Sequence, residues 1–294
     1  MSIRKCTKIV RGQSSVDGAG VHLQRVLGLK TVMDFDPFLL LDGFDSYDPK
    51  DYIKGFPWHP HRGIETVTYL LKGKIEHGDS LGNKGVIKYL ECQWMTAGSG
   101  IIHQEMPLAS DRMLGCQLWV NLPQSMKMTE PAYRDIKQKD IAVVEEEMAT
   151  VRVLSGKYRS KEGAVKGDYV KVQYLDVELK PHSQWIYNET SNDQTLFLYL
   201  IEGSFAVDED LMKFEERACA ALMSSSSSHH NEFDEIIVKS GSNGARFFVI
   251  AAKPLNEPIS WGGPIVMNTR EELDLAFEEL DNKTFIKHEK PLYL

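Results

Sequence analysis

The sequence predicts an all-β protein that is built from two β-barrels and carries one short helix near its C-terminus. Short segments rich in β-branched and aromatic residues recur along the chain, and turn residues separate them, which is typical of strands. Many short strands at this spacing favour a sandwich or a barrel. The clearest predicted strands are Glu65–Leu71, Val86–Leu90, Leu114–Asn121, Tyr169–Leu179, Leu196–Ile201 and Arg246–Ala251.

The prediction of two barrels rests on the chain length and on a weak internal repeat. The 294 residues are enough for two domains of ordinary size. The sequence YLLKGKI at 69–75 is similar to YLIEGSF at 199–205, and each is predicted to be a strand that ends in a glycine-centred turn. Residues 122–150 are polar, highly charged and poor in strand periodicity. We therefore expect one domain over residues 1–135 and a second over residues 136–294.

A capping-box pattern near the C-terminus predicts the helix. Thr269 and Glu272 have the spacing at which each side chain caps the backbone N–H of the other. Apolar residues follow at the i, i+3, i+4 and i+7 positions of one helical face. These residues are Leu273, Ala276, Phe277 and Leu280. We expect an amphipathic helix of about three turns that packs this face onto a barrel.

Composition and charge exclude several classes of function. The formal net charge is −8, and Lys and Arg are interspersed with Asp and Glu, so the chain lacks the basic stripe that direct nucleic-acid binding requires. The N-terminal segment has no apolar core typical of a secretion signal, and the apolar runs are too short to span a bilayer. The four cysteines form no close-spaced pair, which predicts reduced thiols. A run of serines before His229 and His230 predicts a low-complexity loop. We expect a cytoplasmic protein that binds neither membranes nor nucleic acid directly.

Two pairs of potential metal ligands are the most informative feature of the chain. His59 and His61 form one pair, and His103 and Glu105 form the other, each at spacing i, i+2. Successive side chains of a β-strand point to opposite faces, so residues at i and i+2 point to the same side. Two such strands side by side would aim three imidazoles and one carboxylate at one point. This set suits a divalent first-row metal, namely Fe(II), Mn(II), Ni(II), Cu(II) or Zn(II), and leaves positions open for a substrate.

The residues alone leave two questions open. A histidine pair at this spacing arises readily by chance in a chain with nine histidines, so ordinary structural roles are an alternative to metal binding. The carboxylate ligand is also open, because Glu65 lies four residues after His61 and is an alternative to Glu105. Glu65 could also hydrogen-bond a ligand imidazole without touching the metal. At the offset of the internal repeat, the second domain lacks both ligand pairs.

Five longer motifs carry a resemblance to a known family. They are FDPFLLLDGFD, FPWHPHRGIETVTYLLKG, LGNKGVIKYLECQWMTAGSGIIHQEMP, CQLWVNLP and GGPIVMNTREEL. Together they resemble the pirin family, a branch of the cupin superfamily, over most of the chain and most densely between residues 34 and 134. One departure lies before Gln93, where the family usually has Gly-Asp and this chain has Leu90-Glu91-Cys92. That departure leaves the shape of the turn and the position of Cys92 open.

The resemblance implies a bicupin, with two cupin-type β-barrels and a single metal site in the N-terminal barrel. The C-terminal barrel, within residues 136–294, is then expected to hold no metal. The ligand motif of the family falls on His59, His61, His103 and Glu105, which favours Glu105 over Glu65 as the carboxylate ligand. Iron, as Fe(II), is the metal that the resemblance implies.

The resemblance also implies a function. It suggests a quercetin 2,3-dioxygenase, which opens a flavonol ring with O2 and releases carbon monoxide, with Glu105 as the catalytic residue that takes the proton of the flavonol 3-hydroxyl. Trp94, Met95 and Phe56 are then expected to line the substrate pocket. The alternative is a non-enzymatic protein of the same family, an iron-dependent redox sensor or transcriptional co-regulator that acts through a protein partner.

Overall fold

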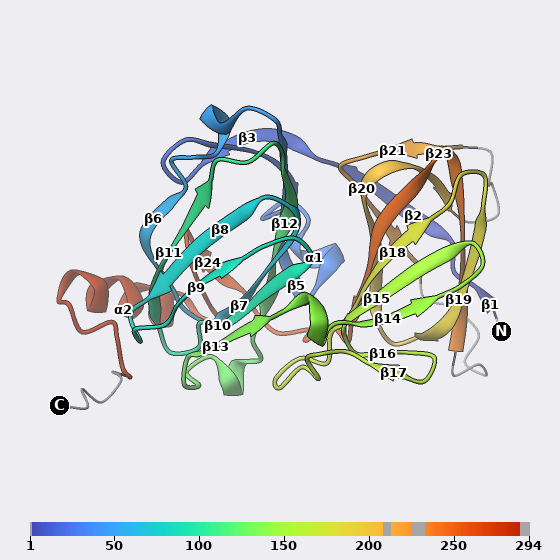
Figure 1. The fold of residues 1–294 in the computed structure, drawn as a ribbon. Coiled ribbons are helices and arrows are strands. Elements are labelled where there is room, and N and C mark those ends of the chain that lie inside the picture. Colours follow the sequence, from blue (N-terminus) through green and yellow to red (C-terminus); the bar gives the residue numbers. More distant parts are fainter. Residues whose placement is uncertain (1, 208–212, 225–232, 289–294) are drawn as a thin grey trace. The chain divides into compact units, whose positions relative to one another are not determined.

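The structure is a computed structural model that describes residues 2–207, 213–224 and 233–288. Within these residues most of the regular structure is β-strand (Figure 1). The predicted all-β class with a short C-terminal helix is therefore confirmed. The predicted serine-rich loop with His229 and His230 lies outside the described residues. In the part of the chain that the structure describes, no helix has the length and apolar character needed to cross a membrane.

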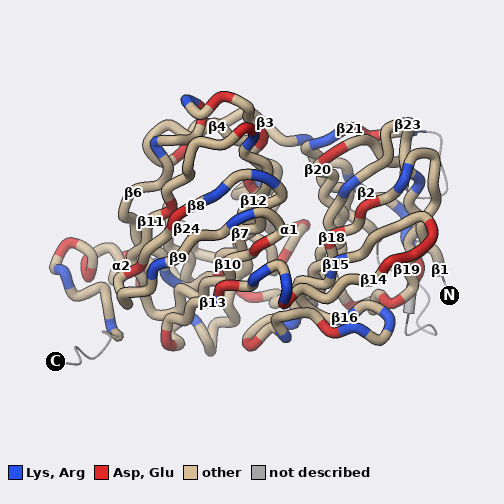
Figure 2. The backbone as a smooth tube through the Cα atoms, viewed as in Figure 1, with Lys and Arg blue, Asp and Glu red and all other residues tan. Residues whose placement is uncertain are grey.

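The chain divides into two compact units, and each unit combines segments that are distant in sequence. The unit named here the site unit comprises Ser14–Arg25, Phe38–Gln138 and Leu255–Leu294. The second unit comprises Met1–Gln13, Val26–Pro37 and Lys139–Pro254. Basic and acidic residues are interspersed along the backbone of both units (Figure 2). Whether residues 1–135 and 136–294 are separate folding domains stays a prediction.

Two sheets form most of the site unit. The first has seven strands, in the spatial order β13 (Ala132–Ile136), β10 (Glu91–Thr96), β7 (Ile64–Lys72), β12 (Met113–Asn121), β5 (Phe38–Ser46), β4 (Val21–Leu27) and β3 (Gln13–Asp17). The second has four strands, in the order β6 (Phe56–His61), β11 (Ile101–Leu108), β8 (Lys74–Asp79) and β9 (Lys84–Ile87). Among the described residues, neither sheet closes on itself through hydrogen bonds. The N-terminal β-barrel that the sequence predicts is thus a pair of open sheets in the structure.

The two sheets of the site unit face each other, and side chains from both sheets meet between them. Thr68 Oγ1 on β7 donates a hydrogen bond of 3.0 Å to Glu105 Oε1 on β11 of the other sheet. Because side chains alternate along a strand, Thr66 shares this inner face with Thr68, whereas Val67 points to the outer face. Buried apolar side chains fill one part of the site unit. They are Val21, Tyr52, Leu70, Ile75, Ile87 and Met113.

The second unit is organised around a ten-stranded sheet. Its main path runs through β14 (Ala142–Glu145), β15 (Ala149–Ser155), β18 (Gln173–Leu179), β23 (Phe233–Ala252), β20 (Thr195–Val207), β22 (Cys219–Met223) and β2 (Cys6–Arg11). Three further strands pair beside this path, namely β1 (Ser2–Ile3), β19 (Gln184–Ser191) and β21 (Glu215–Glu216). Its core is a large apolar cluster that includes Trp185, Phe205 and Phe247. The helix α1 (Val32–Phe35) also belongs to this unit.

A buried ion pair joins β18 and β23 of the second unit, and it leads to a prediction about stability. Arg246 donates from Nε and Nη2 to the two carboxylate oxygens of Asp176, at 2.9 and 2.6 Å, and the Asp176 side chain is fully buried. Removing the Asp176 charge takes away a counter-ion from the buried Arg246 guanidinium, which is costly in a low-dielectric interior. The substitution Asp176→Asn is therefore expected to lower the free energy of unfolding by about 3 kcal/mol, as measured by urea denaturation.

The control for this prediction lies nearby on the same strand. Glu178 accepts a 3.2 Å ion-pair contact from Arg152, but its side chain is 50% exposed. Because exposed ion pairs contribute little, Glu178→Gln is expected to change stability by less than about 1 kcal/mol. Equal losses in the two variants would contradict the assignment of the Asp176 effect to burial of the charge.

A hairpin and a helix from the C-terminal part of the chain complete the site unit. The hairpin pairs β24 (Ser260–Gly262) with β25 (Ile265–Met267), and α2 (Arg270–Asp281) follows. The predicted capping box is confirmed, since Thr269 Oγ1 accepts from the Glu272 N–H and the Glu272 carboxylate accepts from the Thr269 N–H. Leu273 and Ala276 are buried as expected, but Phe277 is 39% exposed. The buried stripe of the helix is therefore narrower than predicted.

Candidate metal centre

Adjacent strands of the four-stranded sheet bring the two predicted ligand pairs together. His103 on β11 is directly opposite His59 on β6, and His61 is opposite Ile101. Directly opposite residues share a face of the sheet, so the three imidazoles lie on one side. An irregularity in the register falls between His103 and Glu105. Glu105 still lies on the same face of β11 as His103, because the two are separated by two positions.

Backbone carbonyls fix the tautomers of His59 and His61. His59 Nδ1 lies 2.8 Å from the Pro57 carbonyl oxygen, and His61 Nδ1 lies 3.1 Å from that of Pro264. In each ring the Nδ1–H then donates, so Nε2 carries a lone pair. The two Nε2 atoms lie 3.1 Å apart. Two nitrogens bound to one metal at about 2.1 Å and at a right angle would lie about 3.0 Å apart, so this geometry fits a shared metal ion.

His103 completes a group of three imidazoles. The potential ligand atoms of His59, His61 and His103 all lie within 4.8 Å of one another. His103 is 1% exposed, and neither of its ring nitrogens has a hydrogen-bond partner among the described residues. Leaving a buried polar atom without a partner is costly. A metal ion held by the three imidazoles would supply the missing partner of His103.

Burial keeps His61 and His103 in the neutral form that binds metals. It lowers the pKa of His61 to about 3, and the neighbouring His59 acts in the same direction, while the hydrogen bond to the Pro264 carbonyl opposes the shift. Burial, followed by the proximity of His61 and His59, also holds the pKa of His103 well below its ordinary value. Neutral imidazoles are available as ligands without first losing a proton.

Glu105 lies beside the histidines and is held by residues of the opposite sheet. Its side chain is 3% exposed. Gln117 Nε2 donates to both carboxylate oxygens at 2.9 and 3.0 Å, and Thr68 Oγ1 donates to one of them. The tight group of ligand atoms includes the three imidazoles and not this carboxylate. The structure therefore places Glu105 next to the group, and its role as a ligand stays a prediction.

Glu65, the alternative carboxylate, lies on the other face of β7. Its Oε1 atom accepts a hydrogen bond of 2.7 Å from Thr96 Oγ1, and the two residues are directly opposite in the β7–β10 register. Glu65 is separated from Thr68 by three positions, so the two side chains point to opposite faces. The structure does not bring Glu65 into the group.

Gln117 and Trp119 on β12 form a support for the site that the sequence analysis missed. Trp119 Nε1 donates to Gln117 Oε1 at 3.0 Å, which turns the amide nitrogen of Gln117 toward Glu105. The Trp119 ring meets the His61 ring edge-to-face at 5.0 Å, and Trp261 lies 5.9 Å from Trp119. The i, i+2 spacing of Gln117 and Trp119 was the available signal, since it placed both side chains on one face.

Arg62 joins the ligand strand to the C-terminal part of the site unit. It follows His61 directly, and its guanidinium is buried. Arg62 Nε donates to the Ser99 carbonyl at 2.6 Å and Nη2 donates to the Phe285 carbonyl at 2.9 Å, while Glu279 on α2 forms an ion pair at 2.7 Å. The Phe285 ring lies 4.2 Å from the guanidinium carbon. These contacts fix the end of β6 on which His61 lies.

Lys127 makes a second connection of the same kind. Its ammonium donates to the carbonyls of Gly63 and Val266, each at 2.8 Å, and to the side chain of Asn121. Gly63 has φ of +78°, and an added Cβ would lie 2.0 Å from the Val266 oxygen, so only glycine fits. Burial lowers the pKa of Lys127 to about 7, and the three acceptors favour the charged form. The turn after His61 is thereby tied to β25.

The strand register sorts the residues that were expected to line a pocket. Met95 is opposite Thr66 and shares the inner face. Trp94 lies on the outer face, because adjacent residues of a strand point in opposite directions. The Phe56 ring lies 6.3 Å from that of His59. Met95 and Phe56 therefore lie on the side of the histidines, and Trp94 lies on the opposite face. That Met95 and Phe56 line a substrate pocket stays a prediction, since Met95 is fully buried as a core residue would be.

The departure from the family pattern before Gln93 affects the turn and not the site. Leu90 adopts φ of +55°, a conformation that glycine takes without strain. Cys92 is fully buried on the outer face with Trp94, and burial raises the pKa of its thiol well above the ordinary value. Cys92 therefore behaves as a small buried apolar residue.

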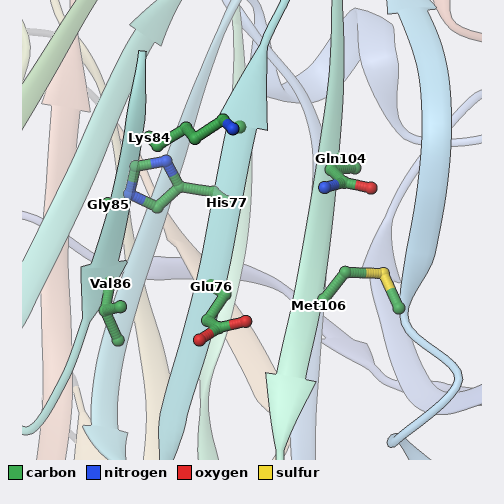
Figure 3. Close-up of a pocket in the computed structure, with 8 residues that line it drawn as sticks. Glu76, His77, Lys84, Gly85, Val86, Gln104 and Met106 are labelled. Carbon is green, nitrogen blue, oxygen red and sulfur yellow. The ribbon is translucent and has the colours of Figure 1, made fainter. Parts of the chain in front are cut away.

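A groove of about 440 Å³ lies on the same four-stranded sheet (Figure 3). It is lined by Glu76, His77, Gly78, Lys84, Gly85, Val86, Gln104 and Met106. Gln104 and Met106 alternate with His103 and Glu105 along β11, so they point to the outer face of the sheet. The groove therefore lies mainly on the outer face, although its lining residue His77 is directly opposite Glu105 and shares the inner face with it.

Facing β-sheets that present three converging imidazoles define a cupin-type protein with a candidate metal centre. Comparison with known families gives the same class. Residues 20–120 match the pirin family, and residues 174–286 match the pirin C-terminal cupin domain. The chain belongs to the pirin family and has its two-domain cupin architecture.

Individual relatives extend over nearly the whole chain. A pirin-like protein from Caulobacter vibrioides is 40% identical over 97% of this chain and 100% of its own length. Human pirin is 37% identical over 96% of this chain and 93% of its own length. The crystal structure of a quercetin 2,3-dioxygenase from Acinetobacter baumannii is similar with a TM-score of 0.86 and 30% identity, and covers 97% of this chain and 99% of that protein.

Proposed function

We propose that this protein is a metal-dependent dioxygenase that opens a flavonol such as quercetin with O2. The observation that carries the proposal is the convergence of the His59 and His61 Nε2 atoms, 3.1 Å apart, beside the ring of His103, which has no hydrogen-bond partner in the part of the chain that the structure describes. The similarity to the Acinetobacter baumannii quercetin 2,3-dioxygenase supports the substrate class. In this proposal His59, His61, His103 and Glu105 hold a divalent metal, Fe(II) in the first instance.

The proposed reaction consumes one flavonol and one O2. The C2–C3 and C3–C4 bonds of the flavonol break, C3 leaves as carbon monoxide, and both atoms of O2 remain in the ring-opened ester product. When bound, the metal supplies Lewis acidity that lowers the pKa of the flavonol 3-hydroxyl and a path for electrons between flavonol and O2. Mn(II), Ni(II), Cu(II) and Zn(II) also suit imidazole and carboxylate ligands.

In this reaction the side chains of the protein transfer one proton and position the group that accepts it. Glu105 takes the proton of the 3-hydroxyl, and the proton is returned to the carboxyl group of the product. Gln117 and Thr68 donate hydrogen bonds to the Glu105 carboxylate and keep it directed at the histidines. Trp119 holds Gln117 in turn. The surrounding burial excludes water from the proton transfer.

The test is reconstitution of the protein with Fe(II) under anaerobic conditions, followed by addition of quercetin and then O2. We expect loss of the flavonol absorbance band and release of one carbon monoxide per quercetin, with both signals absent in His61→Ala. Iron bound at full occupancy without turnover would contradict the dioxygenase proposal for this substrate. That outcome would favour the alternative of an iron-dependent redox sensor that acts through a protein partner.

A further inference from the structure

Two buried polar atoms on the inner face of the seven-stranded sheet have no role in the arrangement described so far. Gln93 Oε1 on β10 and Thr66 Oγ1 on β7 have no hydrogen-bond partner among the described residues. Gln93 is 2% exposed and Thr66 is 1% exposed. A buried polar atom without a partner costs free energy, so such atoms point to a group that binds there.

The strand register places both atoms beside the candidate metal centre. Gln93 is directly opposite Thr68, whose hydroxyl donates to Glu105. Thr66 is directly opposite Trp119, whose ring contacts that of His61. Since opposite residues share a face, Gln93 and Thr66 point into the space between the sheets.

Neighbouring polar groups on this inner face are already paired, which sets Gln93 and Thr66 apart. Tyr133 and Asp135 on β13 are hydrogen-bonded to each other, and Tyr133 also contacts His77 on β8. Met95 is opposite Thr66 on β7 and Tyr133 on β13, and it is fully buried. The surface therefore combines an apolar residue with two unpaired oxygen atoms.

We propose that Gln93 and Thr66 form a subsite that recognises phenolic hydroxyl groups of the substrate. The inference rests on the proposed flavonol chemistry and adds the basis of substrate choice. Gln93 Oε1 accepts a hydrogen bond from one phenolic O–H, and the Thr66 hydroxyl accepts from or donates to a second. Met95 packs against the flat ring between them. A site built to hydrogen-bond a hydroxyl discriminates against an analogue that lacks it.

The experiment compares quercetin with 3-hydroxyflavone, which keeps the 3-hydroxyl and lacks the other four. Gln93→Leu and Thr66→Val remove the polar atoms with little change of volume. In each variant we expect the ratio of kcat/KM for quercetin to that for 3-hydroxyflavone to fall by about tenfold or more. We also expect an effect on binding to the Fe(II)-loaded protein without O2. In each variant the dissociation constant for quercetin is expected to rise, relative to that for 3-hydroxyflavone, by the same factor of about tenfold or more.

Matched variants separate recognition from general disturbance. Cys92→Ala changes a buried residue on the opposite face of the same strand and is expected to leave the ratio unchanged. Thr66→Ser restores a hydroxyl and is expected to restore the ratio that Thr66→Val loses. If Gln93→Leu does not fold, Gln93→Met takes its place. An unchanged ratio, or equal losses for the two flavonols, would overturn the subsite.

The same measurements keep the two proposals apart. Turnover of quercetin by the unmodified protein with no change of ratio in the variants would overturn the subsite and leave the dioxygenase function standing. A change of ratio in anaerobic binding without turnover would support the subsite and overturn the dioxygenase function. Absence of binding of either flavonol to the iron-loaded protein would overturn both.

Discussion

His103→Ala is expected to lower the affinity for Fe(II) by more than about 100-fold. Loss of a residue that only hydrogen-bonds a metal ligand lowers metal affinity by up to about 100-fold, and loss of a ligand is expected to cost more. His103 contributes one of three converging imidazoles, and neither of its nitrogens has a hydrogen-bond partner within the described part of the chain. A metal that binds the folded state also stabilises it, by about 2.7 kcal/mol when the metal is at 100 times its dissociation constant. We expect the unmodified protein to gain this stability on addition of Fe(II) and His103→Ala to gain almost none. Thermal unfolding with and without metal, together with metal analysis, measures both effects.

The control for the histidine prediction is a histidine outside the group. His182 is exposed and lies in the second unit, so His182→Ala is expected to keep the full metal content and the full thermal shift. Full occupancy of His103→Ala at the same metal affinity would show that the ring is not a ligand. The burial of both His103 ring nitrogens without a hydrogen-bond partner among the described residues would then have to be explained in another way.

Glu105→Gln is expected to lower kcat for quercetin by a factor of about 100 to 10,000, the usual range for loss of a general base. The change keeps the volume of the side chain but removes the group that accepts the proton. It also directs an amide N–H₂ toward the donating nitrogen of Gln117 in place of one carboxylate oxygen. Single-turnover kinetics at matched iron content separate the loss of proton transfer from any loss of metal.

Glu65→Gln provides the matched control, because Glu65 is also a buried carboxylate of the site unit but lies on the opposite face of β7. This variant is expected to keep kcat within about threefold, an effect of under 1 kcal/mol on the barrier. If Glu105→Gln loses iron and turnover together, its main role is that of a ligand. If Glu65→Gln loses turnover and Glu105→Gln does not, the assignment of the catalytic carboxylate is wrong.

Local sequence patterns predicted the features that depend on neighbouring residues in the chain. The capping box of Thr269 and Glu272 requires only a spacing of three residues, and the structure contains it. The i, i+2 spacing of His59 and His61 fixes a shared face as soon as the segment is a strand. Pairing of this strand with that of His103 was inferred from the chemistry of the ligands, and the register contains it.

Features that depend on the register or on distant segments could not be predicted in the same way. The opposite faces of Trp94 and Met95 follow from which residue of β7 each one meets. The carbonyl that orients His61 comes from Pro264, 203 residues further along the chain. The exposure of Phe277 depends on how α2 packs against β24 and β25. In each case the deciding contact is with a residue that no local pattern specifies.

The dependence of His61 on the C-terminal hairpin has a consequence for the order of events during synthesis. The ribosome makes all three histidines before it makes Pro264, Val266 and Phe285, which orient His61 and fix the turn after it. A nascent chain that has folded only β6 and β11 therefore presents a His61 ring whose tautomer is not yet set, whereas the Pro57 carbonyl that orients His59 is already present. The proposed metal site then reaches its final geometry only after Pro264 has been translated.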